Sequence, residues 1–180
     1  MIQCVRIPTE RVGVLIGPKG TTKARIEKLA GVKLSIDSEE GDVEIDSTHA
    51  QDPAMGVAVC SVVTAIGRGF SPDKALKLLE DEFFLEILDI RDYVGKKREH
   101  VIRMRSRIIG THGKTRALIE ELTGAHVSVF GNTVGIIGDS MQVDVARRAL
   151  EMLLEGSEHA AVYHFLEGRA AQLKVDRMGF

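Results

Sequence analysis

The sequence predicts an α+β protein made of two similar units that follow one another along the chain. The first observation is an internal repeat, since residues 16–31 align with residues 109–124 at an offset of 93 residues. Ile, Gly, Gly, Thr, Ala, Ile, Glu, Leu and Gly recur in register between these segments. Each copy is followed by two short apolar runs that flank a turn, which is typical of paired strands. With 180 residues and 44% hydrophobic content, the chain can form two small cores.

The first unit is expected to begin with a strand at residues 3–7, followed by a short helical stretch, a glycine loop and a second helix. Strands follow at residues 32–36 and 43–45, on either side of the turn at 39–42. The dipeptide Asp52-Pro53 signals the start of a last helix that runs to about Ile66.

The second unit repeats this order. It has a strand at 84–90, a helical stretch before the second glycine loop, strands at 126–130 and 134–137, and a last helix from Asp139 to about Glu155. Ser71-Pro72-Asp73 caps a short connecting helix that ends near Glu80, and a final helix covers about 158–173. We therefore expect a first domain at 1–70, a connecting helix at 71–80, a second domain at 81–156, and a C-terminal helix and tail at 157–180.

Location and redox state follow from what the chain lacks and how its cysteines are spaced. There is no apolar run long enough to span a membrane, and the N-terminus does not resemble a secretory signal. These features predict a soluble cytoplasmic protein that has no membrane partner. Cys4 and Cys60 lie far apart in apolar segments, which favours reduced, buried thiols over a disulfide or a zinc site.

Charge is sorted along the chain even though the net charge is only −2. Residues 96–150 contain ten basic and five acidic residues, whereas residues 71–95 contain three basic and seven acidic residues. A nucleic-acid-binding face would need such a separation. The alternative is a solvated helix surface.

Two glycine loops carry the functional signal, Gly17-Pro18-Lys19-Gly20 and Gly110-Thr111-His112-Gly113. Glycine permits the tight turn between two helices and lets a sugar-phosphate backbone come close. The amides that begin the following helix would then face the phosphates. Cations near the loops would add attraction, and the candidates are Lys19, Lys23, Lys114 and Arg116. Aspartate at both Gly110 and Gly113 is expected to abolish binding while leaving the fold intact.

An aliphatic groove is expected beside each loop, on which unstacked bases could lie. The first would contain Ile16, Leu34 and Ile36, and the second Ile109, Val127 and Val129. Ordinary core packing is the alternative for these residues. Arg103, Arg105 and Arg107 either extend the RNA path or solvate a helix, and the sequence leaves both open.

The β-α-α-β-β-α order with Ile-Gly-x-x-Gly, present twice, resembles the type I KH domain. The segment from Arg107 to Arg116 and the segment at 156–166 resemble the archaeal KH proteins related to the eukaryotic assembly factor called partner of Nob-one. This resemblance implies binding to single-stranded RNA, namely small-subunit (16S) rRNA near its 3′ end, during ribosome maturation. It also implies other assembly factors and a maturation endonuclease supplied by another chain. Eukaryotic members are thought to have a degraded first loop, whereas Gly17 to Gly20 is intact here, so one or both loops could hold RNA.

Other functions are less well supported by the sequence. Gly113-Lys114-Thr115 imitates the end of a nucleotide-binding P-loop, but the required first glycine is replaced by Ile108. His159 and His164 have no acidic ligand pattern nearby, so no metal site, cofactor or enzymatic activity is expected. A general RNA-binding adaptor and a protein-interaction scaffold remain as alternatives to a ribosomal role.

Overall fold

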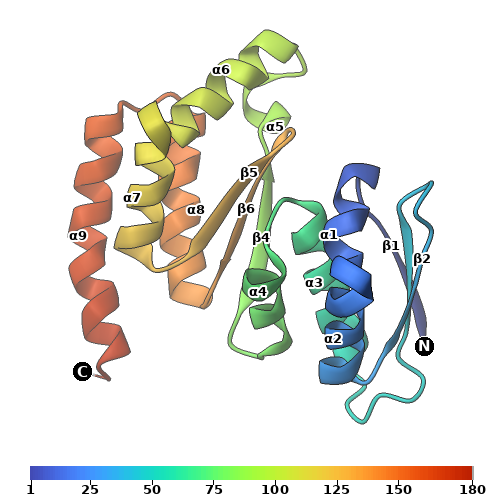
Figure 1. Cartoon of the computed structure of the whole chain (residues 1–180). Helices are drawn as coiled ribbons and strands as arrows, with labels where there is room; N and C mark the ends of the chain where they lie inside the picture. Colours follow the sequence, from blue (N-terminus) through green and yellow to red (C-terminus); the bar gives the residue numbers. More distant parts are fainter. Residues whose placement is uncertain (180) are drawn as a thin grey trace. The chain divides into compact units, whose positions relative to one another are not determined.

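The computed structural model describes residues 1–179, and the chain divides into two compact units between Phe83 and Phe84. Each unit contains one three-stranded antiparallel sheet, with its helices packed on one face of that sheet (Figure 1). The predicted α+β class with two β-α-α-β-β-α units is therefore confirmed.

In the first unit the sheet has the order β1-β3-β2. Its strands are β1 (Ile2–Arg6), β2 (Lys33–Ile36) and β3 (Asp42–Asp46). Its helices are η1 (Thr9–Arg11), α1 (Val12–Ile16), η2 (Pro18–Gly20), α2 (Thr21–Ala30), α3 (Met55–Gly67), α4 (Pro72–Ala75) and η3 (Leu76–Leu79), where η marks a 3₁₀ helix. Leu34, Val43 and Ile45 alternate with polar residues along β2 and β3, and all three point into the core. Alternation thus gives this sheet a buried and a solvated face.

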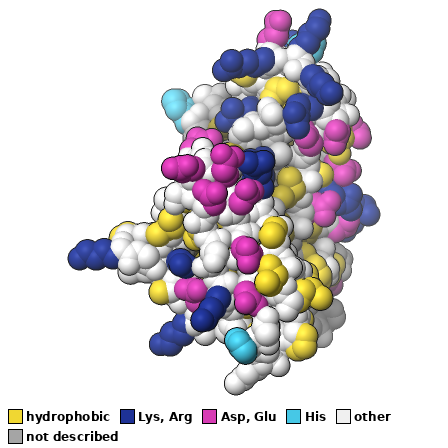
Figure 2. All heavy atoms as spheres, turned by 90° about the vertical axis from the view of Figure 1, so that its right-hand side faces the viewer, with side chains coloured by type: hydrophobic (Ala, Val, Ile, Leu, Met, Phe, Trp, Pro, Cys, Tyr) yellow, Lys and Arg dark blue, Asp and Glu magenta, His cyan; other side chains and the backbone are white. Residues whose placement is uncertain are grey.

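The solvated face of this sheet carries mixed charge and not a basic surface. Figure 2 shows acidic side chains gathered over the turn between β2 and β3, which contains Asp37, Glu39 and Glu40. Cys4 lies on the exposed side of β1, so the prediction that both thiols are buried is wrong for Cys4. Cys60 of α3 is half-buried, and burial raises the pKa of its thiol. Both cysteines are free.

The connecting segment forms two short pieces where one helix was expected. The Ser71 hydroxyl caps α4 by accepting a hydrogen bond from the Lys74 amide at 3.4 Å, and the chain then tightens into η3. Both pieces pack against α3 through Ala75, Leu76 and Leu78. They therefore extend the core of the first unit.

In the second unit the sheet order is β4-β6-β5, the same arrangement as in the first. Its strands are β4 (Phe84–Asp89), β5 (His126–Phe130) and β6 (Thr133–Gly138). Its helices are α5 (Arg91–Val94), α6 (Arg98–Ile109), η4 (Thr111–Gly113), α7 (Lys114–Thr123), α8 (Ser140–Leu154) and α9 (His159–Arg177). A capping box starts α8, because Asp139 accepts from the Gln142 amide and Gln142 accepts from the Asp139 amide, each at 2.9 Å.

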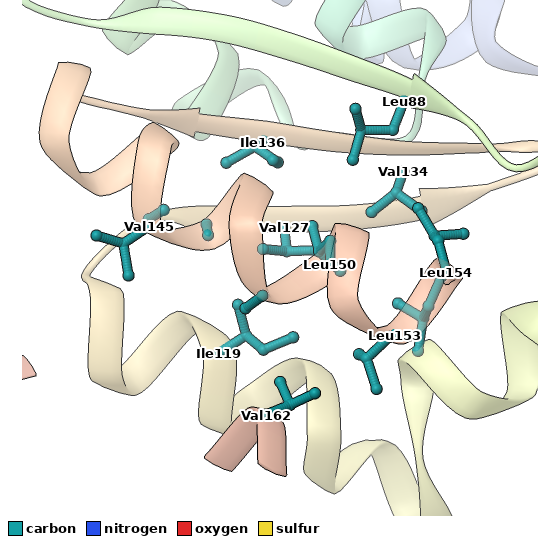
Figure 3. Close-up of a cluster of buried hydrophobic side chains, with 14 of the residues drawn as sticks. Leu88, Ile119, Val127, Val134, Ile136, Val145, Leu150, Leu153, Leu154 and Val162 are labelled. Carbon is teal, nitrogen blue, oxygen red and sulfur yellow. The ribbon is translucent and has the colours of Figure 1, made fainter. Parts of the chain in front are cut away.

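Helix α8 lies at the centre of the second unit. In Figure 3, Val134 and Ile136 of β6 lie on one side of α8, with Ile119 of α7 and Val162 of α9 on the other. Helix α9 packs against α7 and α8, and it runs to Arg177, four residues beyond its expected end. Within residues 1–179, no helix is both long enough and apolar enough to cross a membrane.

Candidate RNA-binding loops

The two glycine loops have nearly the same backbone conformation. Gly17 and Gly110 have φ/ψ of 75°/172° and 77°/172°, and Gly20 and Gly113 have 75°/15° and 75°/13°. Lys19 and His112 also match, with left-handed values of 54°/29° and 55°/28°. These values place the first, third and fourth residues of each loop in regions that L side chains rarely adopt. The sequence repeat is therefore a structural repeat at the level of individual torsion angles.

The first glycine of each loop is required by close packing as well as by its backbone. A Cβ atom at Gly17 would lie 2.8 Å from the Thr22 amide nitrogen, and one at Gly110 would lie 2.7 Å from that of Thr115. A Cβ at Gly20 or Gly113 would meet open space, so only the positive φ disfavours a side chain there. The close approach of Thr115 argues against the expectation that aspartate at Gly110 would leave the fold intact.

Each loop leads directly into the N-terminus of a helix whose first amides have no side-chain cap. The residues before α2 and α7 are Gly20 and Gly113, which have no side chain that could accept from the first turn. Such amides, together with the helix dipole, attract an anion. Both loops therefore present a concentration of partial positive charge beside an open surface.

The loop side chains point outward in both units. Pro18 and Lys19 are exposed in the first loop, and Thr111 and His112 are exposed in the second. Lys114 at the start of α7 is also exposed, and Lys23 is half-buried. These residues lie where a phosphate held by the loop could reach them.

Two predicted RNA contacts already have partners inside the second unit. Arg107 donates to the carbonyl oxygens of Leu153 at 3.0 Å and Ser157 at 2.5 Å, which ties α6 to the end of α8. Arg116 pairs with Glu120 and lies 3.5 Å from the Val127 carbonyl oxygen, between α7 and β5. Either guanidinium would have to share these bonds with RNA.

The predicted grooves combine partly exposed and buried aliphatic residues. Ile16, Ile36, Ile109 and Val129 are all partly exposed. Leu34 and Val127, in contrast, are 3% and 4% exposed and belong to the core. In the first unit the Glu27 carboxylate accepts from the Leu34 amide at 3.0 Å, which joins α2 to the edge of the sheet. Only the four partly exposed residues therefore offer surface to a base, and the groove is narrower than the six predicted aliphatic residues would make it.

Sequence reasoning missed three residues that hold the loop helices in place. Arg11 donates to the carbonyl oxygens of Ile66 at 2.8 Å and Phe70 at 2.9 Å, and burial lowers the pKa of its guanidinium. In the second unit, α9 supplies Tyr163, whose hydroxyl lies 2.9 Å from the Thr115 hydroxyl, and His159, whose Nε2 lies 2.9 Å from the Arg107 carbonyl oxygen. The repeat could not reveal His159 or Tyr163, because α9 lies outside it.

Comparison with known families divides the chain in the same way. Residues 84–171 match the second KH domain of PNO1 proteins, described as a eukaryotic-type (type I) KH domain, and residues 2–51 match the KH domain. The predicted resemblance to type I KH domains is thereby confirmed.

Individual relatives agree with these matches. A KH domain-containing protein of Methanocaldococcus jannaschii is 49% identical over 177 residues, which cover 98% of this chain and 77% of the relative. The pre-rRNA-processing protein PNO1 of Eremothecium gossypii is 27% identical over 79% of this chain. That alignment spans 54% of the relative, so the chain matches about half the length of that protein.

A solved structure shows the same fold over nearly the whole chain. It is the aDim2p-rRNA complex with a/eIF2alpha from Pyrococcus horikoshii, which is 45% identical with a TM-score of 0.89 and covers 96% of both chains. A shared fold at this level of identity, together with the archaeal relative, shows common descent. This chain belongs to the KH-domain family, among the archaeal proteins homologous to the pre-rRNA-processing proteins PNO1 and Dim2p.

Proposed function

We propose that this protein binds single-stranded RNA of the small ribosomal subunit, near the 3′ end of 16S rRNA, during ribosome maturation. The observation that carries the proposal is the pair of matching loops, each opening onto a helix N-terminus without a side-chain cap. The names of the relatives support the choice of RNA, because one is a pre-rRNA-processing protein and another was solved in a complex with rRNA.

The geometry supports separate roles for the loop and the groove, with the loop binding the RNA backbone and the groove binding the bases. The sugar-phosphate backbone would lie on the loop, where exposed Lys19 or Lys114 supplies a cation. Bases would lie on the partly exposed aliphatic residues, Ile16 and Ile36 in one unit or Ile109 and Val129 in the other. A KH site of this kind holds about four nucleotides. We expect cleavage of the RNA to be left to an endonuclease on another chain, and the protein to act in the cytoplasm.

The experiment that tests the proposal changes the middle of each loop and leaves the glycines in place. Thr111→Asp with His112→Asp, and Pro18→Asp with Lys19→Asp, put negative charge at exposed positions without touching the packed Gly110 or Gly17. Aspartate tolerates the left-handed backbone at positions 19 and 112 better than most residues do. Matched control variants carry Ser and Asn at the same positions, which alter shape but add no charge.

Affinity is measured for labelled 3′-terminal small-subunit rRNA and for an unrelated single strand, across a salt series. We expect preference for the rRNA end, and a loss of at least about tenfold when aspartates occupy a loop that holds RNA. The Ser and Asn control at the second loop should retain most of the affinity, whereas the control at the first loop should lose the share that Lys19 supplies. Unchanged affinity with both loops carrying aspartate would overturn the loop assignment.

The RNA controls decide between the remaining functions. Equal binding of the two RNAs would point to a general RNA-binding adaptor. Binding of neither RNA would favour a protein-interaction scaffold. Variants at the first loop alone and at the second loop alone then show which of them holds RNA.

A further inference from the structure

A pocket of about 400 Å³ opens beside the second loop, on the side of α9. Helix α6 contributes Arg103, Ser106 and Arg107 to its lining, and the loop and the start of α7 contribute Gly110, Thr111 and Lys114. The remaining wall is Thr115 with His159 and Tyr163 of α9. All of these residues belong to the second unit.

The wall of the pocket is held by hydrogen bonds between its elements. The Tyr163 and Thr115 hydroxyls lie 2.9 Å apart, which joins α9 to the first turn of α7. The His159 ring nitrogen and the Arg107 carbonyl oxygen are also 2.9 Å apart, which joins α9 to the last turn of α6. The pocket is therefore preformed by three helices and does not depend on exposed side chains alone.

Two cations line the pocket and form no ion pair within the described residues. Arg103 and Lys114 are exposed, and no carboxylate lies within ion-pairing distance of either in the described part of the chain. Arg147 and Arg148 of α8, in contrast, both pair with Asp144. Unpaired cations around a concave, hydroxyl-containing site favour an anion as ligand.

The first unit lacks the cations that line this pocket, although its loop has the same conformation. At the 93-residue offset, Glu10, Gly13 and Thr21 occupy the positions of Arg103, Ser106 and Lys114. The first unit also has no helix corresponding to α9. The pocket is thus an addition to the second unit and not a property of the repeat.

The pocket is also separate from the aliphatic groove. In an α-helix with 3.6 residues per turn, Arg103 lies about 120° around α6 from Ile109, which is the groove residue on that helix. Gly110 and Lys114 lie between the two surfaces, because they belong to the loop and to the start of α7. An RNA strand that crosses the second loop would reach the pocket after leaving the groove.

We infer that this pocket binds a phosphate group of RNA that continues past the nucleotides held in the second groove. The inference rests on the proposed RNA-binding function and adds a second phosphate site to it. The phosphate is either an internal phosphodiester or the terminal phosphate of a strand that ends there. Arg103 and Lys114 supply the charge, and the α9 contacts keep the wall in place.

The test compares Arg103→Gln with Lys174→Gln in the full-length protein. Lys174 lies near the other end of α9 and away from the pocket, so its variant loses the same charge from the same unit. The probes are a four-nucleotide RNA that fills one groove, the same RNA with 5′- or 3′-phosphate, and a longer RNA extended at both ends. Circular dichroism melting shows that both variants remain folded.

We expect Arg103→Gln to weaken the longer RNA about threefold to tenfold and to lower the slope of log affinity against log salt by about 0.7. The unphosphorylated four-nucleotide RNA should bind as before, and Lys174→Gln should change neither. A loss seen with the end-phosphorylated short RNA as well would identify a terminal phosphate as a ligand.

Two outcomes would overturn the inference. One is an Arg103→Gln protein that matches Lys174→Gln on every RNA. The other is an equal loss on the unphosphorylated four-nucleotide RNA and on the longer RNA, which would place Arg103 in the groove. Failure of the underlying function looks different, because Thr111→Asp with His112→Asp would then leave the affinity for the short RNA unchanged.

Discussion

Gly110 and Gly113 belong to the same loop, but a side chain would lower the free energy of unfolding by different amounts at the two positions. Gly110 combines φ of 77° and ψ of 172° with the close approach of Thr115, whereas Gly113 has only a left-handed backbone. We expect Gly110→Ala to lower the free energy of unfolding by about 3 kcal/mol and Gly113→Ala by about 1 kcal/mol. Urea denaturation measures both, and equal losses would contradict the close-packing argument.

At this scale the sequence predicted the loop residues but not all of their surroundings. Glycines at fixed spacing are visible in a sequence, and so are neighbouring cations. Arg107 donates to the carbonyl oxygens of Leu153 and Ser157 because the end of α8 lies beside α6. The local sequence around Arg107 does not reveal that position. The exposure of Cys4 was missed because an apolar run does not say which of its residues faces the core.

At the scale of elements, the hydrogen bonds of Arg107 join α6 to the end of α8, and their contribution to stability can be tested. Arg107→Ala removes two hydrogen bonds from a partly buried guanidinium to backbone carbonyls, so we expect the free energy of unfolding to fall by about 1 to 3 kcal/mol. Arg103→Ala, on the same helix, is the control and should leave stability nearly unchanged, because that side chain is exposed. Thermal and urea unfolding of both variants decide the matter.

A stable Arg107→Ala protein that loses RNA affinity would show that this arginine acts on RNA and not on the fold.

The boundaries of most elements were predicted to within a few residues, since turn residues and capping patterns mark them. The connecting segment differed, because the turn of 3₁₀ helix in η3 follows from packing on α3 and has no signal of its own.

For the whole molecule, the division between Phe83 and Phe84 makes a direct prediction. Each unit has its own sheet and its own core, so we expect fragments 1–83 and 84–180 each to fold and to unfold cooperatively. Circular dichroism in urea tests this. An unfolded fragment 1–83 would mean that the first unit depends on contacts outside itself.

The internal repeat made the two-unit architecture predictable, because nine positions carry the same residue in register across the loop and the helix after it. It also limited the prediction of the site. The second unit contains α9 and the pocket beside it, and neither belongs to the repeat. Matching one copy of the repeat with the other therefore could not predict them. The surroundings of the second loop therefore differ from those of the first through α9 and the pocket beside it.

The bonds from Arg107 and His159 make the second loop and the start of α9 parts of one coupled system. Under the proposed function, a ligand on α9 that alters the loop through those bonds would change the affinity of the loop for RNA. RNA at the loop must then change the affinity of that ligand by the same factor, because a coupling free energy between two sites is reciprocal. Such coupling would be confined to the second unit, because the first unit has no helix that corresponds to α9.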